Sequence, residues 1–391
     1  MRIGILHNAY RYRGGEDLVV ETESELLENN GHHVSKMILD NTEIFATLGK
    51  TMRSMPTMGM GWNTAIGDRL VEWVREEGLD LVHCHNIYPV ISPAALMTMH
   101  AHRIPIVMTL HNFRPICANG LQIRDGKPCV ECTTKGCSSA LKYGCYRQSR
   151  LQSASWMIGR VHAQHSRVWD RSVSQFIAPS EYVRQTFLSA GFDPSRITVR
   201  PHTVPARCAP TKDAFGALCV GRLDQSKGVY ELAHRWPVHA EPLTFIGTGP
   251  EEIRIKKLKK PNVHCLGWCE PQRVAEHMSR CRVVIQPSKL NETFGLTIAE
   301  GASVARPSVA FNKGGVASII DHNQTGLLVD TNSMADLCNA ALDLITRPIV
   351  CLQMGLNAND KYSKTYSPRA GIRSLLDVYT LALSPSARVS A

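Results

Sequence analysis

The chain has 391 residues, with 44 lysine and arginine against 34 aspartate and glutamate residues, and its formal net charge is +10 at pH 7. A chain of this length is too long to fold around a single hydrophobic core, so we predict two domains. The amino terminus lacks a signal-peptide pattern, no apolar run is long enough to span a bilayer, and no nucleic-acid-binding motif accompanies the dispersed basic residues, so we expect a cytoplasmic protein without a nucleic-acid partner.

The first half alternates short apolar strands with amphipathic helices. Strands are predicted at residues 2–8, 32–39, 79–86 and 104–112, helices at about 16–30 and 64–78, and a further strand and helix within 172–192. Gly31 follows the first helix, where a left-handed cap favours glycine. This order predicts a parallel sheet with right-handed crossovers.

The same pattern starts again near residue 217, with strands ALCVGRL, LTFIGTG, VHCLGW, RVVIQPS and RPSVAF. We therefore predict an α/β fold of two doubly wound, Rossmann-like domains facing across a cleft. The predicted limits are 1–207, with a cysteine-rich excursion at 117–147, then 208–366, a last helix at 367–383 and a disordered tail at 384–391. Ligands of such sheets bind at the carboxyl ends of the strands.

Two cations follow one of these strands in the stretch VGRLDQSKG. Arg222 and Lys227 lie on a short loop, and Gly221 permits a close backbone approach. Two positive charges there can neutralise a diphosphate. The alternative is an exposed loop with ordinary basic residues.

The stretch NETFGLTIAEG begins a helix at Gly295 and Leu296, where free backbone N–H groups and the helix dipole attract anions. Glu292 and Glu300 are eight residues apart. Along a helix this is roughly 12 Å, comparable with the separation of a sugar and a ribose joined by a diphosphate. We interpret Glu300 as the ribose ligand and Glu292 as the ligand of the transferred sugar; alone, the segment would favour two surface glutamates flanking a turn.

The carboxyl-terminal half resembles glycosyltransferase family 4, a family of retaining enzymes with the GT-B fold. The stretches VGRLDQSKGVYEL, FIGTGPE, VHCLGW, QPSKLNETFGLTIAEGASVARPSVA and GGVASIIDHNQTGLLVD match its motifs in order and spacing. The first half agrees more loosely through RGGED, HCHN, TLHNFRPIC and APSEYVR. The stretch RPHTVP departs from the Asn-Gly pair that the family usually has at the domain linker.

The resemblance implies that Arg222 and Lys227 stabilise the leaving nucleoside diphosphate, that Glu300 binds the ribose and that Glu292 binds the donor sugar. Glu292 as a nucleophile for double displacement is an alternative to this positioning role. His111 resembles the histidine near the reacting centre, and His85 is a second candidate, with a structural histidine as the alternative for both. The other implied donor contacts are Gly14, Gly15, Gly247, Gly249, Trp268, Phe294, Gly295 and Leu296.

The resemblance further implies that the last helix crosses back to pack on the first domain. We expect a retaining hexosyltransferase that moves a sugar from a UDP or GDP sugar to a saccharide or lipid-linked saccharide acceptor, in the synthesis of bacterial surface polysaccharide or glycoconjugate. The chain has no Asp-x-Asp motif, which favours metal-independent transfer. A GT-B nucleotide-sugar isomerase and a non-catalytic nucleotide-sugar-binding module are the alternatives, and donor base, sugar and acceptor stay open.

Thirteen cysteines occur in the chain, and most are scattered singly through apolar segments. Cys117, Cys129, Cys132 and Cys145 have spacings suited to a structural zinc ion, with Cys137 as a substitute for one of them. Disulfides, an iron–sulfur cluster and free thiols are the alternatives. A Met- and Gly-rich loop at 51–61 predicts contact with a membrane surface at the inner face of the cell membrane.

Overall fold

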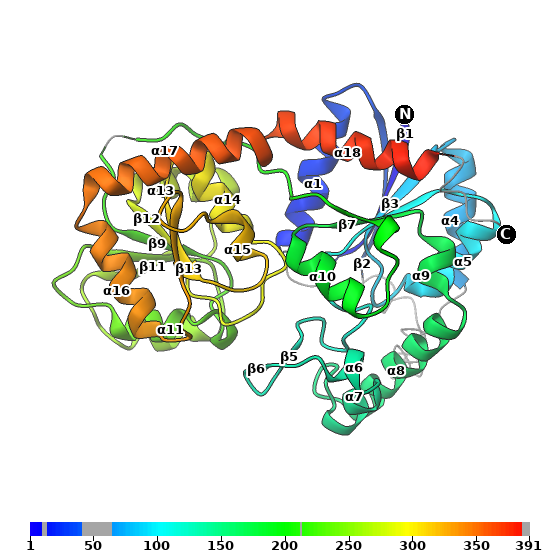
Figure 1. Cartoon of the computed structure of the whole chain (residues 1–391), viewed down its shortest axis with the longest axis horizontal. Helices are drawn as coiled ribbons and strands as arrows, with labels where there is room; N and C mark the ends of the chain where they lie inside the picture. Colours follow the sequence, from blue (N-terminus) through cyan, green and yellow to red (C-terminus); the bar gives the residue numbers. More distant parts are fainter. Residues whose placement is uncertain (10–13, 41–64, 212, 385–391) are drawn as a thin grey trace. The chain divides into compact units, whose positions relative to one another are not determined.

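The computed structural model describes residues 1–9, 14–40, 65–211 and 213–384, and in them it contains two six-stranded parallel sheets (Figure 1). The chain divides into two compact units, Met1–Arg200 with Ile372–Ala391, and Pro201–Gly371. The predicted α/β fold with two doubly wound sheets is confirmed. The loop at 51–61 and residues 385–391 of the expected tail lie outside the described residues.

The sheet of the first unit has the strand order β2-β1-β3-β4-β7-β8. Its strands are β1 (Arg2–Ala9), β2 (His33–Asp40), β3 (Leu81–Asn86), β4 (Ile106–Thr109), β7 (Gln175–Ala178) and β8 (Ile197–Val199). All neighbours pair in parallel. Strand addition reverses between β1 and β3, which places the switch point of this sheet at their carboxyl ends.

Helices cover both faces of this sheet. They are α1 (Gly15–Glu28), α4 (Ala65–Glu76), α5 (Ser92–Ala101), α9 (Val168–Ser172), α10 (Glu181–Ser189) and α18 (Pro368–Leu383). One core joins α1 and the second half of α18 to Ile3 and Ile5 of β1. The other joins α4, α5, α9 and α10 to Leu6 of β1 and Val82 of β3. Gly31, after α1, has φ +79° and confirms the expected left-handed cap.

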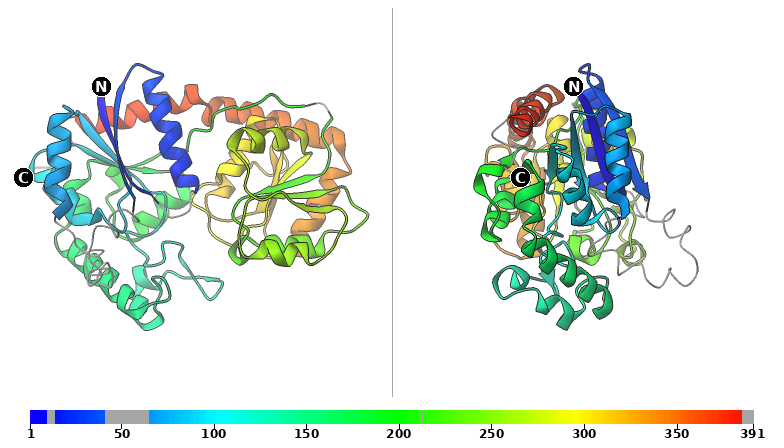
Figure 2. Two further views of the ribbon diagram at one scale, coloured as in Figure 1. Left: turned by 180° about the vertical axis from the view of Figure 1, so that it is seen from behind. Right: turned by 90° about the vertical axis from the view of Figure 1, so that its right-hand side faces the viewer.

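A long excursion leaves the first unit between β4 and β7 and projects away from its sheet in every view (Figure 2). It contains the antiparallel pair β5 (Ile123–Arg124) and β6 (Lys127–Pro128), then α6 (Glu131–Thr134), α7 (Ser138–Tyr143) and α8 (Arg150–His165). The two strands have two residues each, whereas α8, with 16 residues, is the longest helix of this segment.

The sheet of the second unit has the order β11-β10-β9-β12-β13-β14. Its strands are β9 (Ala217–Val220), β10 (Leu243–Ile246), β11 (Val263–Cys265), β12 (Val283–Gln286), β13 (Ser308–Phe311) and β14 (Gly326–Val329). The helices are α11 (Val229–Arg235), α12 (Glu251–Lys256), α13 (Pro271–Arg280), α14 (Leu296–Ser303), α15 (Val316–Ile319), α16 (Met334–Ile345) and α17 (Pro348–Thr365). The largest core of this unit joins α11 and α16 to the central strands β9 and β12.

The two ends of the second unit pack against each other. The Val204 N–H donates to the Tyr366 carbonyl at 2.8 Å, and a Cβ on Gly371 would lie 1.9 Å from Thr203 Oγ1. Residues 201–207 therefore belong to this unit, whereas the sequence-based limit at 207 lies further along the chain. Helix α18 begins here at Pro368 and continues into the first unit from Ile372.

Among the described residues, no single helix is long and apolar enough to cross a membrane. One bent pair, Met334–Ile345 with Pro348–Leu383, passes that test by length and composition, with a bend of 101°.

Truncation of Leu375 tests the packing of α18 on the first sheet. Its side chain is fully buried in the core with Ile3 and Ile5, so we expect Leu375→Ala to lower the free energy of unfolding by about 2–5 kcal/mol. Leu381, on the same helix, is 49% exposed, and its change to alanine should cost no more than about 0.5 kcal/mol. Urea unfolding measures both; equal losses would contradict this packing.

Candidate active site

The direction of strand addition in the second unit reverses between β9 and β12, which pair directly. Ligands of open parallel sheets bind beside the carboxyl ends of strands at such a switch point, because the two departing loops diverge there. The loops are residues 221–228 after β9 and 287–295 after β12. They carry Arg222, Lys227 and Glu292, so the structure brings these three sequence-predicted residues to the same end of the sheet.

Asp224 organises the loop after β9. Its carboxylate accepts hydrogen bonds from the Ser226 and Lys227 N–H groups at 2.9 and 3.2 Å and begins a 3-10 turn at Gln225–Lys227. Arg222 Nε donates to the other carboxylate oxygen at 2.5 Å, while the Arg222 side chain stays 66% exposed. Burial raises the pKa of Asp224, but hydrogen bonds from Ser226 and the charge of Arg222 outweigh it and the net pKa is lowered. The loop presents an exposed guanidinium on a rigid turn.

Lys227 connects this loop to Glu292 on the loop after β12. Its Nζ donates to Glu292 Oε1 at 2.5 Å, and the Ser288 hydroxyl donates to the same oxygen at 2.6 Å. Burial raises the pKa of the Glu292 carboxyl, but the charge and hydrogen bond of Lys227 act against it. With further hydrogen bonds from Ser288 and Gln286, the net pKa of Glu292 is below its ordinary value. Glu292 is therefore an anion held beside a cation.

Backbone contacts fix the distance between the two loops. The Lys289 N–H donates to the Ser226 carbonyl at 2.9 Å, and a Cβ on Gly228 (φ +68°) would lie 2.4 Å from the Pro287 carbonyl oxygen. Gly314 (φ +61°), after β13, approaches the Glu292 backbone in the same way, with a Cβ only 2.7 Å from its carbonyl oxygen. These approaches require glycine, because any side chain would push the loops apart.

Helix α14 begins beside Glu292. Gly295 precedes it with φ +132°, and Leu296 is its first residue. Phe294 is 3% exposed and packs on the rings of His202 and Tyr366, so only its backbone is available to a ligand. The first turn of the helix presents N–H groups that have no partner within the helix.

Glu300 lies within α14 and is partly buried. Burial raises the pKa of its carboxyl, and the charge of Arg207 acts weakly in the opposite direction. No side chain in the described part of the chain donates a hydrogen bond to this carboxylate. Glu300 can therefore accept hydrogen bonds from the hydroxyls of a ligand.

Gly247 and Gly249 follow β10 and contact the loop after β9. A Cβ on Gly247 (φ +132°) would lie 2.0 Å from the Gly221 carbonyl oxygen, and one on Gly249 would lie 2.3 Å from that of Leu223. The glycines are therefore explained by close packing of neighbouring loops, independently of a base. Trp268, after β11, is 58% exposed.

Gly14 and Gly15 lie at the amino terminus of α1, beside the switch point of the first unit. Both are exposed, and Gly14 is the N-cap residue. Asp17 holds this helix end, because its carboxylate accepts a hydrogen bond from the Gly14 N–H at 2.7 Å and lies 3.0 Å from His7 Nε2. His7 is on β1, so the helix start is tied to the end of that strand.

His111 follows β4 and is 6% exposed. Its Nε2 lies 2.9 Å from Nδ1 of His85, and the two rings stack with centroids 5.2 Å apart. His85 is 2% exposed, and His83 lies on the same face of β3. His83 has a hydroxyl partner on each ring nitrogen, Tyr379 at 2.9 Å and Thr109 at 2.7 Å.

Glu23 of α1 completes this buried cluster. Its Oε1 pairs with the Arg200 guanidinium, and its Oε2 lies 3.8 Å from His83 Nδ1 and 3.7 Å from His85 Nε2. Ligand atoms of Glu23, His83 and His85 all lie within 4.8 Å of one another, a separation that a metal ion can bridge. The guanidinium already neutralises Glu23 and would repel a divalent cation. We therefore interpret the cluster as a polar network that supports His85 and, through it, His111.

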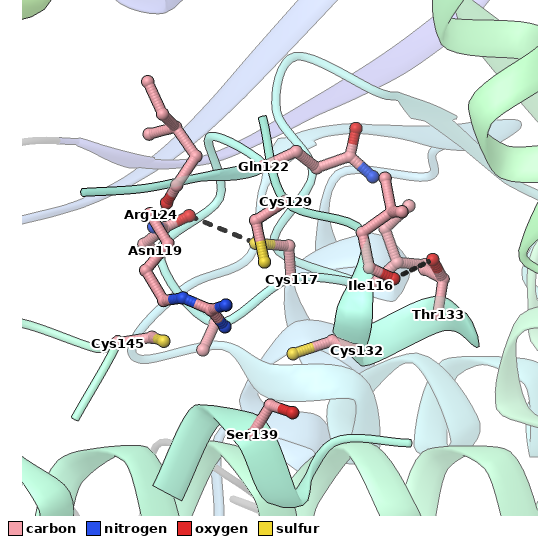
Figure 3. A pocket seen from close by; sticks show the side chains of 13 residues that line it. Ile116, Cys117, Asn119, Gln122, Arg124, Cys129, Cys132, Thr133, Ser139 and Cys145 are labelled. Atoms are coloured by element: carbon pink, nitrogen blue, oxygen red, sulfur yellow. Dashed lines mark hydrogen bonds between the residues drawn. The ribbon is translucent and has the colours of Figure 1, made fainter. Parts of the chain in front are cut away.

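The four cysteines predicted as zinc ligands line one cavity of the excursion (Figure 3). Cys137, the predicted substitute, is buried instead in a small apolar cluster that includes Ala118, Ala140 and Trp156. All thirteen cysteines belong to the described residues, and all are free thiols rather than disulfides.

Sequence reasoning missed Glu23, Arg200, Tyr379 and Ser288. For Glu23 a signal exists, because it lies among the apolar residues Val20 and Leu27 on the buried face of α1. A carboxylate on the apolar stripe of a helix requires a buried partner. Arg200 and Tyr379 come from distant segments, and neither carries a local signal of this contact.

The pH dependence of stability tests the buried cluster. Burial and the charge of Arg200 lower the pKa of His83 from 6.5 to about 3. The folded protein then keeps this ring neutral while the unfolded chain takes up a proton. The contribution of this neutral ring to the free energy of unfolding is fully present above pH 6.5. It is lost as the pH falls from 6.5 toward 3, at about 1.4 kcal/mol per pH unit.

We expect His83→Gln to remove this part of the slope in urea unfolding between about pH 7 and about pH 5. The exposed residue His165 is the control, because His165→Gln leaves the buried cluster intact and should keep the wild-type slope. An unchanged slope in the His83 variant would refute the neutral buried ring.

Three proteins that are similar to this chain have names that describe glycosyltransferases. It is 29% identical over 169 residues to an uncharacterized glycosyltransferase, MJ1178, of Methanocaldococcus jannaschii (42% of this chain, 47% of the relative). It is 28% identical over 156 residues to the D-rhamnosyltransferase WbpZ of Pseudomonas aeruginosa (38% and 41%), and 26% identical over 172 residues to the O-antigen chain mannosyltransferase C of Escherichia coli (42% and 46%). Each match spans less than half of the relative's length.

A solved structure of Anabaena Alr3699/HepE in complex with UDP is similar over 97% of this chain and 100% of that chain, with a TM-score of 0.65 and 17% identity. This similarity shows the fold, GT-B. Residues 13–207 match the model described as Glycosyltransferase Family 4, and residues 214–347 match the model described as Glycosyl transferases group 1. The chain therefore belongs to glycosyltransferase family 4.

Proposed function

We propose that the chain transfers a hexose from a nucleoside-diphosphate sugar to a saccharide or lipid-linked saccharide acceptor, with retention of the anomeric configuration and without a catalytic metal ion. The observation that carries this proposal is the Lys227–Glu292 ion pair at the switch point of the second sheet. It places a cation and an anion side by side between two loops, next to the start of a helix. A nucleoside-diphosphate sugar likewise carries its diphosphate directly next to a polyhydroxyl ring.

Donor binding replaces the contacts that the two cations make with carboxylates. Arg222 leaves Asp224 and Lys227 leaves Glu292, and both turn to the diphosphate oxygens, where the N–H groups at Gly295 and Leu296 add hydrogen bonds. Glu292, released from Lys227, accepts hydrogen bonds from sugar hydroxyls. The charges of Arg222, Asp224, Lys227 and Glu292 sum to zero before the donor binds, and Lys313 adds a positive charge near Glu292.

Glu300 holds the ribose in this proposal, since its partly buried carboxylate has hydrogen-bonding capacity left. Exposed Trp268 and the loops at Gly247 and Gly249 border the base. For the first unit, the family resemblance supports a backbone approach of Gly14 and Gly15 to the donor and a role of His111 at the reacting centre, with His85 as its support. In this proposal the first unit binds the acceptor and the second unit, Pro201–Gly371, binds the donor.

The chemical step separates charge. The bond from the anomeric carbon to the diphosphate oxygen breaks, and its electron pair goes to that oxygen. Arg222, Lys227 and the helix N–H groups stabilise the negative charge as it develops. The acceptor hydroxyl attacks the face from which the diphosphate departs, and its proton passes to the leaving phosphate oxygen. The cysteine excursion takes no part in this step.

The names of two relatives, an O-antigen mannosyltransferase and a rhamnosyltransferase, support a role in bacterial surface polysaccharide or glycoconjugate synthesis. One structural neighbour was solved with UDP-glucose, which supports UDP sugars, and GDP sugars are included on the same chemistry. A lipid-linked acceptor places the enzyme at the inner face of the cell membrane.

The test of the function is a thermal-shift panel of nucleoside diphosphates and their sugars, followed by product analysis with the donor that stabilises the protein. Ligand at 100 times its dissociation constant adds about 2.7 kcal/mol of stability. Transfer to an acceptor is the expected result. Rearrangement of the donor without acceptor would indicate an isomerase, and binding without any turnover would indicate a binding module.

Two substitutions separate the phosphate contact from the sugar contact. Lys227→Met removes a charged hydrogen bond to the diphosphate, so we expect UDP or GDP affinity to fall about 10- to 100-fold in calorimetry. Glu292→Gln frees Lys227 from its partner. We expect it to keep or tighten nucleoside diphosphate binding while the rate of transfer falls at least about 100-fold.

The control for the lost charge is Lys256→Met, because Lys256 pairs with Glu252 on the exposed side of α12 and should leave binding unchanged. If Glu292→Gln weakened nucleoside diphosphate binding as much as Lys227→Met did, the division of roles would be wrong.

A further inference from the structure

Four cysteines from three stretches of the chain line the same cavity of the excursion. Cys117 lies on the turn after β4, Cys129 just after β6, Cys132 on α6 and Cys145 just after α7. Figure 3 shows the Cys132 and Cys145 sulfur atoms approaching from different sides the space next to the Cys117 and Cys129 sulfurs. The fold therefore brings together thiols that lie far apart in the sequence, between residues 117 and 145.

Backbone hydrogen bonds hold these cysteines in place. The N–H of Cys117 donates to the Phe113 carbonyl at 2.7 Å, and the N–H of Cys129 donates to the Gln122 carbonyl at 2.8 Å. Backbone groups at Gln122, Gly120 and Asn119 also form hydrogen bonds to the Cys117 sulfur, which fix its position at the cavity.

The cavity has the size of one small ligand. Its volume is about 20 Å³, which suffices for a water molecule or a single metal ion. Arg124 also lines it, and its guanidinium is held by two hydrogen bonds to Glu131 at 2.7 and 2.9 Å. Arg160 is 8% exposed near the same cysteines. Arg160 offsets part of the negative charge that several thiolates would bring, whereas Glu131 already balances the charge of Arg124.

The part of the excursion that carries the four cysteines, residues 117–147, contains only short elements and packs on α8 through Trp156. Its strands have two residues each, α6 has four and α7 has six. Its own apolar cluster consists of five buried residues, Ala118, Cys137, Ala140, Tyr146 and Trp156. Segments of this size without a sufficient core are commonly stabilised by disulfides or a structural metal ion. The cysteines form no disulfide.

We propose that Cys117, Cys129, Cys132 and Cys145 bind one structural zinc ion as a tetrahedral thiolate site. Cys137 is not a ligand in this proposal, since it does not line the cavity that the other four cysteines share. Zinc binding displaces the thiol protons and leaves a site of net charge −2, which lies beside Arg124 and Arg160. Among the described residues, only Glu23, His83 and His85 have ligand atoms that all lie within 4.8 Å of one another. The sulfur atoms of the four cysteines do not all lie this close to one another, so they move inward when the ion binds.

The test begins with the full chain, purified under reducing conditions and dialysed against a weak chelator. We expect one zinc per chain by elemental analysis. Replacement by Co²⁺ should give the intense thiolate charge-transfer bands and the visible bands of a tetrahedral sulfur site. A thiol-binding mercurial should release the zinc as it reacts with the thiols of the excursion, and removal of the zinc should speed proteolysis within residues 117–147.

Matched variants identify the ligands. Cys132→Ser should lower zinc affinity by more than about 100-fold, because losing a ligand exceeds the loss of a supporting contact. Cys137→Ser lies in the same segment and should keep the zinc, and Glu23→Gln should also keep it, which excludes the buried Glu23 cluster as the binding site. Circular dichroism checks that each variant is folded; if Cys132→Ser is not, the Co²⁺ spectrum and mercurial titration of the wild-type chain decide.

Three outcomes would overturn the proposal. The first is a folded wild-type chain that holds neither zinc nor Co²⁺ after exposure to them. The second is iron with acid-labile sulfide, which would assign an iron–sulfur cluster. The third is zinc that stays in Cys132→Ser and leaves in Glu23→Gln, which would move the metal to the buried histidines.

Discussion

The ion pair between Lys227 and Glu292 is the contact on which the rest of the candidate site depends. It joins the loops that leave β9 and β12, the two strands between which the sheet reverses its order. Because the hydroxyl of Ser288 shares the same carboxylate oxygen, the charges are fixed relative to the sheet before any donor is present. A partly buried pair of this kind contributes little to stability. Its value lies in keeping a phosphate contact and a sugar contact next to each other until the donor binds and separates them.

The first unit also holds a carboxylate next to a cation, but here the pair is buried and lies among histidines. Its switch point, between β1 and β3, leads to a cluster in which Glu23, His83 and His85 are almost completely buried. Burying a charge requires a compensating partner, which Arg200 supplies, and Tyr379 brings a hydroxyl from the last helix. The carboxyl-terminal helix therefore takes part in the environment of the histidines as well as in the core.

Local signals in the sequence were sufficient for most strands of the two sheets and for their parallel order, but they did not identify β8 or β14. Arg222, Lys227 and Glu292 were found because loops after parallel strands meet at one edge. The partners were not found, since the contacts of Arg200 and Tyr379 depend on segments far apart in the chain. The glycines show a second reason why sequence alone is insufficient. Gly247 is required because the neighbouring loop packs closely against it, and a sequence motif cannot distinguish this packing from contact with a ligand.

The most direct measurement is a crystal structure of the full chain with UDP or GDP. The account predicts that the diphosphate lies at the start of α14, within hydrogen-bonding distance of Arg222 and Lys227, and that Lys227 has left Glu292. A diphosphate bound elsewhere, or one bound there with the Lys227–Glu292 pair still intact, would contradict it.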